Sequence, residues 1–525
     1  MEFSFDTASS IDLKLESGTQ TRSIPDRRLA CRNRQAIHLT ALGVFLLLFS
    51  VYLLTNGGGL FISDGVVMFK TTEAIVEFRT IELEPDPLSA FQIVEGRDGH
   101  YFSKYGIGQP LAAAPLYAFG GVVHNVWLDY MWDKAVRMYF VSLFNPLATA
   151  LTGAVLFLLA FRLRYGIYLS LFLALAWGLC SLAWPYTRVY FSEPLYGLCL
   201  VSAAYFLLLY KQTEERHRFA WLFMAGASLG YAILTRIAGF IVLPWFTVYA
   251  VWAASYHPEA QFIRELRSSW RFRGRPTLPS LRISLAAIVV FAAPLVLAIA
   301  IMLAHNVLRF SDALNSGYPA AESFRTPLTE GLVGLLLSPG QSLFIYVPLT
   351  ALSVVAWRPF WVRERSTAML YTAVILSTLI PSALWWSWWG GWSWGPRLLV
   401  PVLPFAFLGL GPLLQRSQLA RIAAVPLAAL GFVVALLGTL VDFNPYLAGV
   451  QEPDVYFEPG FSPIRAHLRS LLDGEHIVVA TFRLESLGFN DRFAVIAPLL
   501  IILMICASLA ITLHGVSRYD RTMVS

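Results

Sequence analysis

Residues 283–304, ISLAAIVVFAAPLVLAIAIMLA, form a run of twenty-two positions without one charged side chain. A helix of about 20 such residues crosses the roughly 30 Å of hydrocarbon in a bilayer, whereas a barrel strand needs only about ten. Comparable runs recur along the 525 residues, of which 57% are hydrophobic and only 14% charged. Soluble domains carry about 25% charged residues. The sequence therefore predicts an all-α polytopic membrane protein, and it excludes a soluble domain and a β-barrel.

These runs predict about twelve membrane spans. Arg27, Arg28, Arg32 and Arg34 precede the first run, and since Lys and Arg collect in cytoplasmic loops, we expect this end to be cytoplasmic. Every other short basic loop then falls on the same side. The expected spans lie near 36–55, 136–161, 166–184, 194–210, 219–235, 238–256, 283–304, 342–357, 366–384, 398–414, 421–441 and 493–513; the basic segments are Arg162 with Arg164, 211–218, 264–282, 358–365, 416–421 and 518–521.

The distribution of charge explains the net charge of +6. The basic excess orients the chain in the membrane, so it requires no nucleic-acid partner. We expect a cytoplasmic tail over 1–35, a transmembrane domain over 36–441 with a first extracytoplasmic loop at about 56–135, a small extracytoplasmic segment over 442–492, and a last helix with a cytoplasmic C-terminus over 493–525. The tail is longer than the basic region of a signal peptide, which favours an uncleaved signal anchor.

Three segments outside the spans have patterns of their own. Residues 64–78 have the spacing of an amphipathic helix, and 110–127 is apolar but short and contains Gly and Pro, which favours a helix on the outer surface. Residues 477–482 look strand-like. No disulfide framework is expected, because the four cysteines lie in the tail or in or beside spans: Cys31, Cys180, Cys199 and Cys506.

Asp64 follows the first span within a few residues, at the start of the amphipathic segment. Asp is favoured at helix N-termini, where it caps the helix and interacts with the helix dipole. A carboxylate at the membrane edge is also suited to take a proton from a substrate hydroxyl, which requires a base within hydrogen-bond reach. The local sequence leaves both roles open.

A lysine among aromatic and glycine residues occurs in Gly99-His-Tyr-Phe-Ser-Lys-Tyr-Gly-Ile-Gly-Gln-Pro-Leu111. Lys104 is either a surface side chain whose amine reaches the headgroup region or a ligand for a lipid phosphate. In the second case Gly106 and Gly108 let backbone N–H groups approach the phosphate, although the spacing is not that of a P-loop. Tyr105 and Gln109 are candidates to line the same site.

Two opposite charges share the short connection Trp184-Pro-Tyr-Thr-Arg-Val-Tyr-Phe-Ser-Glu-Pro-Leu195. Ser192-Glu193-Pro194 makes an ordinary helix start, but charges beside hydrocarbon are costly unless they are paired or used. Arg188 is therefore a candidate phosphate ligand, and Glu193 is a candidate catalytic acid. Arg236, between two spans, is either a snorkelling side chain or another lining residue.

Six tryptophans fall within Trp385-Trp-Ser-Trp-Trp-Gly-Gly-Trp-Ser-Trp394. An aromatic belt at the membrane interface is the general explanation for such residues. The alternative is a platform, with Trp392 and Trp394 as candidate lining residues, that stacks on sugar rings or a prenyl chain. Arg397 follows at a helix entrance and is a candidate ligand for an anionic phosphate.

The sequence has no close grouping of His and carboxylates with metal-ligand spacing, no Gly-x-Ser-x-Gly elbow and no nucleotide-binding loop. We expect no cofactor, and a divalent metal remains open. His305 lies at an outer helix end beside Asn306 and Arg309. A structural role is the simplest explanation for a lone histidine, and His305 is also a candidate lining residue.

Taken in order, these segments resemble the C-type (GT-C) glycosyltransferases that use polyprenyl-phosphate sugars, nearest the aminoarabinose transferase and protein O-mannosyltransferase families. The resemblance implies that Asp64 stands where the family's first-loop acid acts, Lys104 where a Lys or His binds phosphate, Glu193 where a second external acid is found, and Arg397 in a late Pro-Arg. The matching segments are Asp64 with 72–77, 101–116, 192–194 and 396–404, and elsewhere only hydropathy matches.

Two departures from the family pattern leave the sugar and the acceptor open. Gly65 follows Asp64 where the mannosyltransferases have a second acid, and their Pro-Pro is diluted here to Lys104-Tyr-Gly-Ile-Gly-Gln-Pro110. The implied reaction class is the transfer of a sugar from a polyprenyl-phosphate donor to a hydroxyl acceptor on the extracytoplasmic face, with inversion. The transmembrane domain would then be catalytic, in a bacterial inner membrane, and would serve cell-envelope glycan, lipid or protein glycosylation.

The implied chemistry needs few groups. A prenyl phosphate is a good leaving group, so a base on the acceptor hydroxyl and cations on the departing phosphate suffice. Asp64 would supply the base, and Lys104 and Arg397 the cations. The expected partners are a polyprenyl-phosphate sugar, an extracytoplasmic acceptor and membrane lipids.

Other functions have the same gross architecture. A transporter or lipid flippase also has about twelve spans, but transporters place ionisable residues near the midplane and often have repeated halves. Here the candidates gather at outer helix ends and no repeat is visible. A non-catalytic scaffold and a polymerase or ligase of lipid-linked glycans are further alternatives. The glycosyltransferase hypothesis requires that Asp64, Lys104, Glu193 and Arg397 converge.

Overall fold

The computed structural model describes residues 27–60, 62–86, 89, 91–128, 131–213, 217–254, 278–447, 450, 453–479 and 491–524. Several sequence expectations extend outside these described residues. They are the cytoplasmic tail up to residue 26, most of the basic segment 264–282, and the end of the strand-like segment from residue 480 onward.

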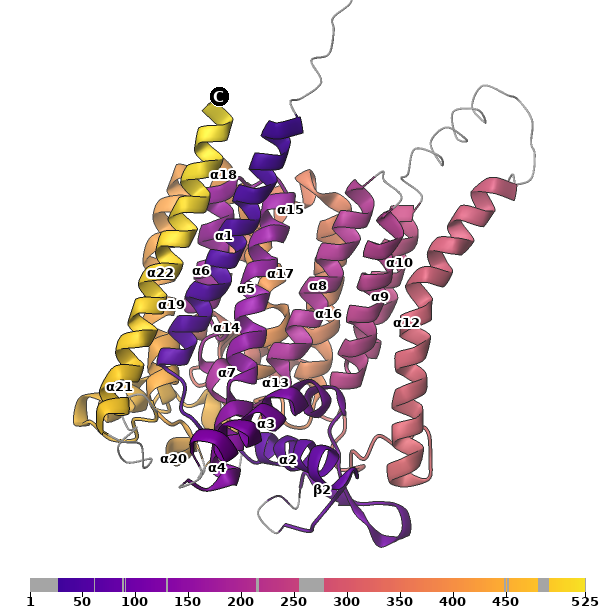
Figure 1. Cartoon of the computed structure of the whole chain (residues 1–525), viewed down its shortest axis with the longest axis vertical. Coiled ribbons are helices and arrows are strands. Elements are labelled where there is room, and N and C mark those ends of the chain that lie inside the picture. Colours follow the sequence, from indigo (N-terminus) through magenta and orange to yellow (C-terminus); the bar gives the residue numbers. More distant parts are fainter. Residues whose placement is uncertain are drawn as a thin grey trace, which may run out of the picture.

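A bundle of long helices makes up most of the molecule (Figure 1). Within the described residues, nine helical stretches are long and apolar enough to cross a membrane. This confirms the prediction of an all-α polytopic membrane protein. The long helices of the bundle are α1 (Arg27–Leu54), α5 (Phe144–Arg162), α8 (Glu193–Gln212), α9 (Arg218–Thr235), α12 (Leu278–Phe310), α16 (Arg365–Leu384), α19 (Gln418–Leu440) and α22 (Asp491–Val524).

Three of the twelve expected spans correspond to shorter helices. These are α6 (Ile167–Leu179), α10 (Gly239–Ala254) and α15 (Leu349–Arg363), with 13, 16 and 15 residues. At a rise of about 1.5 Å per residue such helices are about 20 to 24 Å long, less than the hydrocarbon thickness. The count of twelve spans therefore stays a prediction.

Prolines divide two of the expected spans. The expected span 136–161 is split into α4 (Asp133–Ser142) and α5, because Pro146 near the start of α5 cannot donate a backbone hydrogen bond to the preceding turn. The expected span 398–414 is a series of short pieces broken at Pro401, Pro404 and Pro412. They are the 3₁₀ helix η4 (Arg397–Val402), α17 (Leu403–Gly409) and α18 (Gly411–Arg416).

A layer of surface helices covers one end of the bundle, which we call the loop end (Figure 1). It contains α2 (Ser63–Glu73), which continues as the π-helix η1 (Ala74–Phe78), together with α3 (Gly108–Trp127) and α4. Both surface segments expected from the sequence are therefore helices. The opposite end, where α1 begins and α22 ends, we call the terminal end.

A small sheet at the loop end was not predicted from the sequence. Its strands are β1 (Glu82–Leu83), β2 (Ile93–Glu95) and β3 (Tyr101–Ser103), antiparallel in the order β1-β3-β2, with a short 3₁₀ turn η3 (Arg97–Gly99) between β2 and β3. Strands of two or three residues are too short for an alternation of apolar and polar residues to be recognised. The last strand matters for function, because Lys104 follows it directly.

Short helices complete the loop end: α7 (Pro185–Arg188), α13 (Leu328–Leu337), α14 (Leu343–Tyr346), α20 (Asn444–Leu447), η5 (Pro453–Phe457) and α21 (Pro463–Asp473). The strand expected at 477–482 is only an isolated bridge between Ile477 and Val441 in its described part. His476, just before it, has a φ of 56°, which is incompatible with an extended strand.

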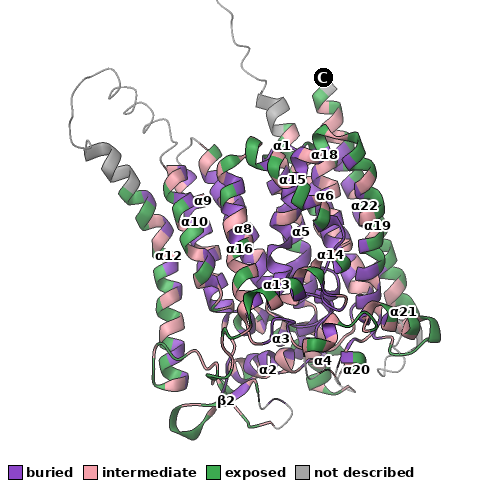
Figure 2. Ribbon diagram, turned by 180° about the vertical axis from the view of Figure 1, so that it is seen from behind, coloured by how far each residue is buried: buried purple, intermediate pink, exposed green. Residues whose placement is uncertain are grey.

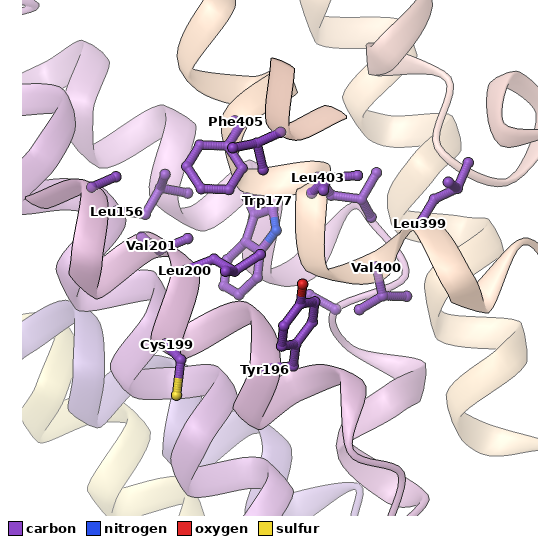
Figure 3. Close-up of a cluster of buried hydrophobic side chains, with 14 of the residues drawn as sticks. Leu156, Trp177, Tyr196, Cys199, Leu200, Val201, Leu399, Val400, Leu403 and Phe405 are labelled. Atoms are coloured by element: carbon purple, nitrogen blue, oxygen red, sulfur yellow. The ribbon is translucent and has the colours of Figure 1, made fainter. Parts of the chain in front are cut away.

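Buried residues concentrate on the inside of the bundle, and exposed residues lie on its outside (Figure 2). Figure 3 shows part of the core, where Trp177 of α6 packs with Leu156 of α5, Leu200 of α8 and Phe405 of α17. Large apolar residues on the outer helices are open, such as Leu297 on α12 at 62% and Leu503 on α22 at 62% exposed. Such extensive apolar surface is typical of a protein solvated by lipid.

The first and last helices pack closely along their length. A Cβ at Gly43 of α1 would lie 2.3 Å from Thr512 Oγ1, and a Cβ at Gly515 of α22 would lie 2.4 Å from Thr40 Oγ1. Small residues at such contacts let membrane helices approach each other when hydrophobic driving force is absent. This pair brings the described start and end of the chain to the same end of the bundle (Figure 1).

Candidate active site

Asp64 is the second residue of α2, where the positive end of the helix dipole favours a carboxylate. The N-cap position is Ile62, and no side chain caps this helix. Asp64 therefore does not cap α2, a role that the local sequence left open. Asp64 instead accepts hydrogen bonds from Arg397 Nη1 at 3.2 Å and from Gln92 Nε2 at 3.4 Å.

Arg397 connects Asp64 to a second carboxylate. Its Nε lies 3.5 Å from Glu193 Oε1, and the same oxygen lies 2.6 Å from Arg236 Nη1. The guanidinium of Arg397 also stacks over the ring of Phe191, 4.1 Å from its centroid. Four charged residues from four separate segments thus form a chain of alternating sign, Asp64–Arg397–Glu193–Arg236, which we call the charge chain.

Glu193 is the first residue of α8, and its side chain is only 2% exposed. The turn before it is fixed from two sides. Asn145 Nδ2 donates to the carbonyl oxygens of Val189 at 2.6 Å and Phe191 at 2.9 Å, and Gln109 Nε2 donates to that of Phe191 at 3.1 Å. Gln109, a candidate lining residue, is therefore a buried support for Glu193.

Lys104 is buried, so it does not snorkel to a headgroup. Its Nζ lies 2.6 Å from Glu322 Oε1, and the two side chains are 7% and 12% exposed. The rings of Tyr105 and Tyr318 flank the amine, with centroids at 5.8 and 5.4 Å. Arg309 of α12 fixes the backbone here by donating to the carbonyl oxygens of Ser103 and Tyr105.

Tyr105 joins Lys104 to the charge chain. Burial raises the pKa of its phenol well above the ordinary value, and the negative charge of Asp64, together with a hydrogen bond to it, raises the pKa further. Tyr105 therefore remains a neutral hydroxyl beside Asp64 at any physiological pH. Asp64, Glu193, Arg397 and Lys104 converge as the glycosyltransferase hypothesis requires.

Gly106 and Gly108 pack against α9. A Cβ at Gly106 would lie 2.4 Å from the carbonyl oxygen of Leu234, and a Cβ at Gly108 would lie 2.6 Å from Thr235 Oγ1. Glycine is required at both positions because the first loop packs directly against the end of α9. This packing explains both glycines, and the expectation that they open the backbone to a phosphate stays a prediction.

Arg188 is part of a different contact. Its side chain is fully buried, with Nη1 3.8 Å from Asp442 Oδ1 and the guanidinium 5.0 Å from the ring centroid of Phe443. Burial lowers its pKa to about 10. Arg188 lies only five positions before Glu193. Its contacts nevertheless attach α7 to the chain after α19, so in this structure Arg188 is one member of an ion pair that connects these two segments.

The tryptophan-rich stretch divides into core and surface residues. Trp394 is 0% exposed and packs edge-on against Tyr346 at 5.2 Å and against His467 at 4.3 Å, so it does not line an open platform. Trp392 is 48% exposed and remains available to a ligand. His305 is buried on α12, one turn before Arg309, and the contacts that hold the charge chain together do not include it.

A groove lies beside Arg236, between α8, α10, α16 and η4. It is lined mostly by apolar and hydroxyl side chains, among them Tyr196, Ile241, Ser377, Pro381 and Leu398. Ile241 belongs to the exposed, lipid-facing surface of α10. The lining of the groove therefore includes both a lipid-facing apolar residue and Arg236, the residue at the end of the charge chain.

Three contributors to the site were missed from the sequence: Gln92, Tyr318 and Glu322. Glu322 lies in the segment 311–327 between α12 and α13, where Asp312 and Arg325 are charged as well. No spacing or motif distinguishes Glu322 from these neighbours. Only the tertiary contact with Lys104 identifies it.

The comparisons with known proteins give similarities at the level of structure. No family model and no curated protein matches the chain. The chain is similar to ArnT from Cupriavidus metallidurans bound to undecaprenyl phosphate, with 15% identity, a TM-score of 0.46, and coverage of 92% of this chain and 77% of that one. The apo state of ArnT gives 15% identity and a TM-score of 0.45, over 92% of this chain and 75% of that one.

The oligosaccharyltransferase AglB from Archaeoglobus fulgidus, in complex with an inhibitory peptide and a dolichol-phosphate, is similar at 13% identity and a TM-score of 0.42. The match covers 78% of this chain and 55% of AglB. At identities this low, the function has to be inferred from the residues of the site.

Proposed function

We propose that the protein is a GT-C-type membrane glycosyltransferase, which moves a sugar from a polyprenyl-phosphate donor to a hydroxyl acceptor. The observation that supports the proposal is the charge chain, in which Asp64 is 3.2 Å from Arg397. A base and a set of cations therefore lie together at the loop end, with Lys104 joined to them through Tyr105. These are the two kinds of group that the transfer needs.

Asp64 is the proposed base. Its side chain is 15% exposed and makes no capping contact, so one face of the carboxylate is available to an acceptor hydroxyl. Arg397 and Gln92 fix its orientation. General base catalysis of this kind contributes about 100 to 10,000-fold to the rate.

Lys104, Arg397 and Arg236 are the proposed cations for the donor phosphate. Charge developing on the departing phosphate is stabilised strongly by fixed cations in a site from which water is excluded. The groove beside Arg236 suits the apolar chain of the donor, because it joins the lipid-facing surface to a guanidinium. Attack from the face opposite the phosphate inverts the anomeric carbon.

We further propose that the loop end is extracytoplasmic and that the membrane is a bacterial inner membrane. Basic residues gather at the terminal end, where Arg363 donates to the carbonyl oxygens of Leu163 and Arg164 and contacts Gln415. Since basic residues are retained on the cytoplasmic side, this end is cytoplasmic and Asp64 faces the opposite compartment. The acceptor would be a lipid, protein or polysaccharide of the cell envelope.

The test is Asp64→Asn in the full-length chain, reconstituted with a polyprenyl-phosphate sugar and membrane extract as the acceptor source. We expect loss of transfer by about 100-fold or more, because the base is removed, with a thermal midpoint close to that of the wild type. Asp98→Asn is the matched control, since Asp98 lies in the same loop and is 73% exposed. Substantial transfer by Asp64→Asn would contradict the base assignment, and lipid movement without donor cleavage would favour a flippase.

A further inference from the structure

We infer that Glu322 and the phosphate of the lipid donor compete for one cation, Lys104. The segment 311–327 then forms a wall of the donor site, and the Glu322 carboxylate leaves Lys104 when a lipid phosphate binds. The inference rests on the proposed function, because it assumes that Lys104 is a phosphate ligand. It adds to that function a residue that sets which ligands are accepted.

The Lys104–Glu322 contact has the properties expected where two anions compete for one cation. Lys104 Nζ and Glu322 Oε1 are 2.6 Å apart, and both side chains are almost buried. The rings of Tyr105 and Tyr318 occupy two flanks of the amine. An anion that approaches Lys104 therefore meets the Glu322 carboxylate at short range, and two negative charges at one buried amine repel each other strongly.

The ion pairs of the site favour the exchange. Lys104 is paired with Glu322, and Arg236 and Arg397 are paired with Glu193 and Asp64. Arg309, beside Lys104, donates to backbone carbonyl oxygens instead. Because the amine of Lys104 already holds one carboxylate, a phosphate binds it favourably when that carboxylate withdraws and returns to water.

Glu322 is the carboxylate that can withdraw. Glu193 is the first residue of α8, is 2% exposed, and lies between two guanidinium groups. Asp64 is held by Arg397 and Gln92. The side-chain hydrogen bond of Glu322 goes to Lys104, and its residue lies on the connecting segment 311–327 and not in a helix.

The backbone around Glu322 is fixed, so the exchange requires only rotation of its side chain. Thr326 N donates to the Leu384 carbonyl at 3.1 Å, Trp386 N donates to that of Ser323 at 3.0 Å, and Asn306 Nδ2 donates to that of Ala313 at 2.9 Å. The rings of Trp385 and Tyr318 also pack edge to face at 6.2 Å. A neutral prenol cannot replace the carboxylate on Lys104, whereas a prenyl phosphate can, so Glu322 selects charged lipids.

Binding of undecaprenyl phosphate to the full-length protein in nanodiscs tests the inference. Glu322→Gln is expected to bind this lipid about tenfold more tightly, because the competing charge–charge hydrogen bond is gone. Asp312→Asn is the matched control with unchanged affinity, since Asp312 is exposed on the same segment and its Oδ1 accepts from Leu314 N, which asparagine can do as well. Lys104→Met is expected to weaken binding.

The double variant Lys104→Met/Glu322→Gln separates competition from a structural role. If Glu322 acts only through Lys104, the double variant binds the lipid as weakly as Lys104→Met, and the tenfold gain disappears. If Glu322→Gln does not fold, Glu322→Asp is expected to shift affinity in the same direction by less, because its side chain is one methylene shorter and holds the carboxylate farther from Lys104.

Three results would overturn the inference in different ways. Unchanged or weaker binding by Glu322→Gln, with Lys104→Met still impaired, rejects the competition and leaves the proposed function standing. A gain that persists in the double variant shows that Glu322 acts through another group. Wild-type affinity in Lys104→Met, or no binding by the wild type, rejects the inference and the proposed phosphate site together.

Discussion

Glu193 and Asp64 contact the same guanidinium, that of Arg397, from two different environments. Asp64 is 15% exposed at the start of a surface helix, whereas Glu193 is 2% exposed at the start of a helix of the bundle. A group that exchanges protons with an acceptor must be reached by the acceptor, so the difference in burial favours Asp64 over Glu193 as the proposed base. Glu193 instead positions Arg236 and Arg397, and the sequence expectation of a catalytic Glu193 becomes the proposal of a positioning residue.

Removing the charge of Glu193 tests this division. Glu193→Gln leaves two buried guanidinium groups without their shared partner, and we expect it to destabilise the fold by about 3 to 5 kcal/mol, as is typical when one member of a buried ion pair is lost. The measurement is the thermal midpoint in detergent, with Asp64→Asn as the less destabilising comparison. A Glu193→Gln protein as stable as the wild type but inactive would show that Glu193 acts on the substrate directly.

His467 predicts a pH dependence of stability. Burial lowers its pKa from 6.5 to about 3, against a smaller raising effect of its hydrogen bond to the Pro463 carbonyl. The folded protein therefore keeps this histidine neutral while the unfolded chain protonates it below pH 6.5. The stabilisation is complete above pH 6.5 and is lost as the pH falls toward 3, by about 2 kcal/mol at pH 5.

Thermal midpoints measured between pH 7 and pH 5 check this prediction. We expect a smaller pH slope in His467→Gln than in the wild type. His100→Gln, in which the replaced side chain is 54% exposed, should retain the wild-type slope. Equal slopes in all three proteins would show that His467 is not the group responsible.

Among the elements, the docking of the first loop on the bundle decides where Lys104 lies. α3 begins against the end of α9, and Tyr231 of α9 donates a hydrogen bond to the Gly108 carbonyl at 2.7 Å. On the other side of the loop, Lys134 of α4 pairs with Glu73 of α2, and Arg137 of α4 pairs with Glu77 of η1. The surface helices and the bundle thus fix both ends of the segment that carries Tyr105.

Gly106→Ala tests this docking. Its Cβ would lie 2.4 Å from the Leu234 carbonyl oxygen, a backbone atom that cannot rotate away. We expect a loss of about 1 to 3 kcal/mol in stability, the usual cost of overpacking, together with lower transfer activity because Lys104 moves. Gly460→Ala is the control, since a Cβ there meets no described atom within 4 Å. A fully active and stable Gly106→Ala would contradict the close contact.

The sequence alone could not predict which prolines break a helix. Pro146 and Pro401 end or divide expected spans, but Pro294 and Pro426 lie inside the continuous helices α12 and α19. All four are proline in apolar sequence. Whether a proline breaks a membrane helix depends on whether neighbouring helices and side chains satisfy the freed carbonyl groups, and that is a property of the packing.

At the scale of the whole molecule, the two ends of the bundle differ in chemistry. The loop end carries the small sheet and the surface helices (Figure 1), and Asp64 of the charge chain lies in surface helix α2. The terminal end, where α5 and α18 end, carries the exposed basic residues Arg164 and Arg416. Many of the exposed residues on the bundle between them are large and apolar. This division predicts a single orientation in the membrane.

Cysteine labelling in intact cells checks the orientation. In a background without the native cysteines, Asp98→Cys and Asp312→Cys are expected to react with a membrane-impermeant maleimide from outside. Arg164→Cys and Arg416→Cys should react only after permeabilisation, because basic residues stay on the cytoplasmic side. The opposite pattern would reverse the proposed compartment of the active site without changing its chemistry.

Local properties of the chain were enough to predict the helical membrane class, the two surface helices and Asp64, Lys104, Glu193 and Arg397 as candidates. Apolar length and charge decide segment by segment whether residues prefer hydrocarbon or water, so these features can be seen without knowing the fold. The partners of those residues depended on the tertiary structure. Arg397 meets Asp64 across 333 positions and Lys104 meets Glu322 across 218, and such contacts follow from how helices dock, which no local pattern encodes.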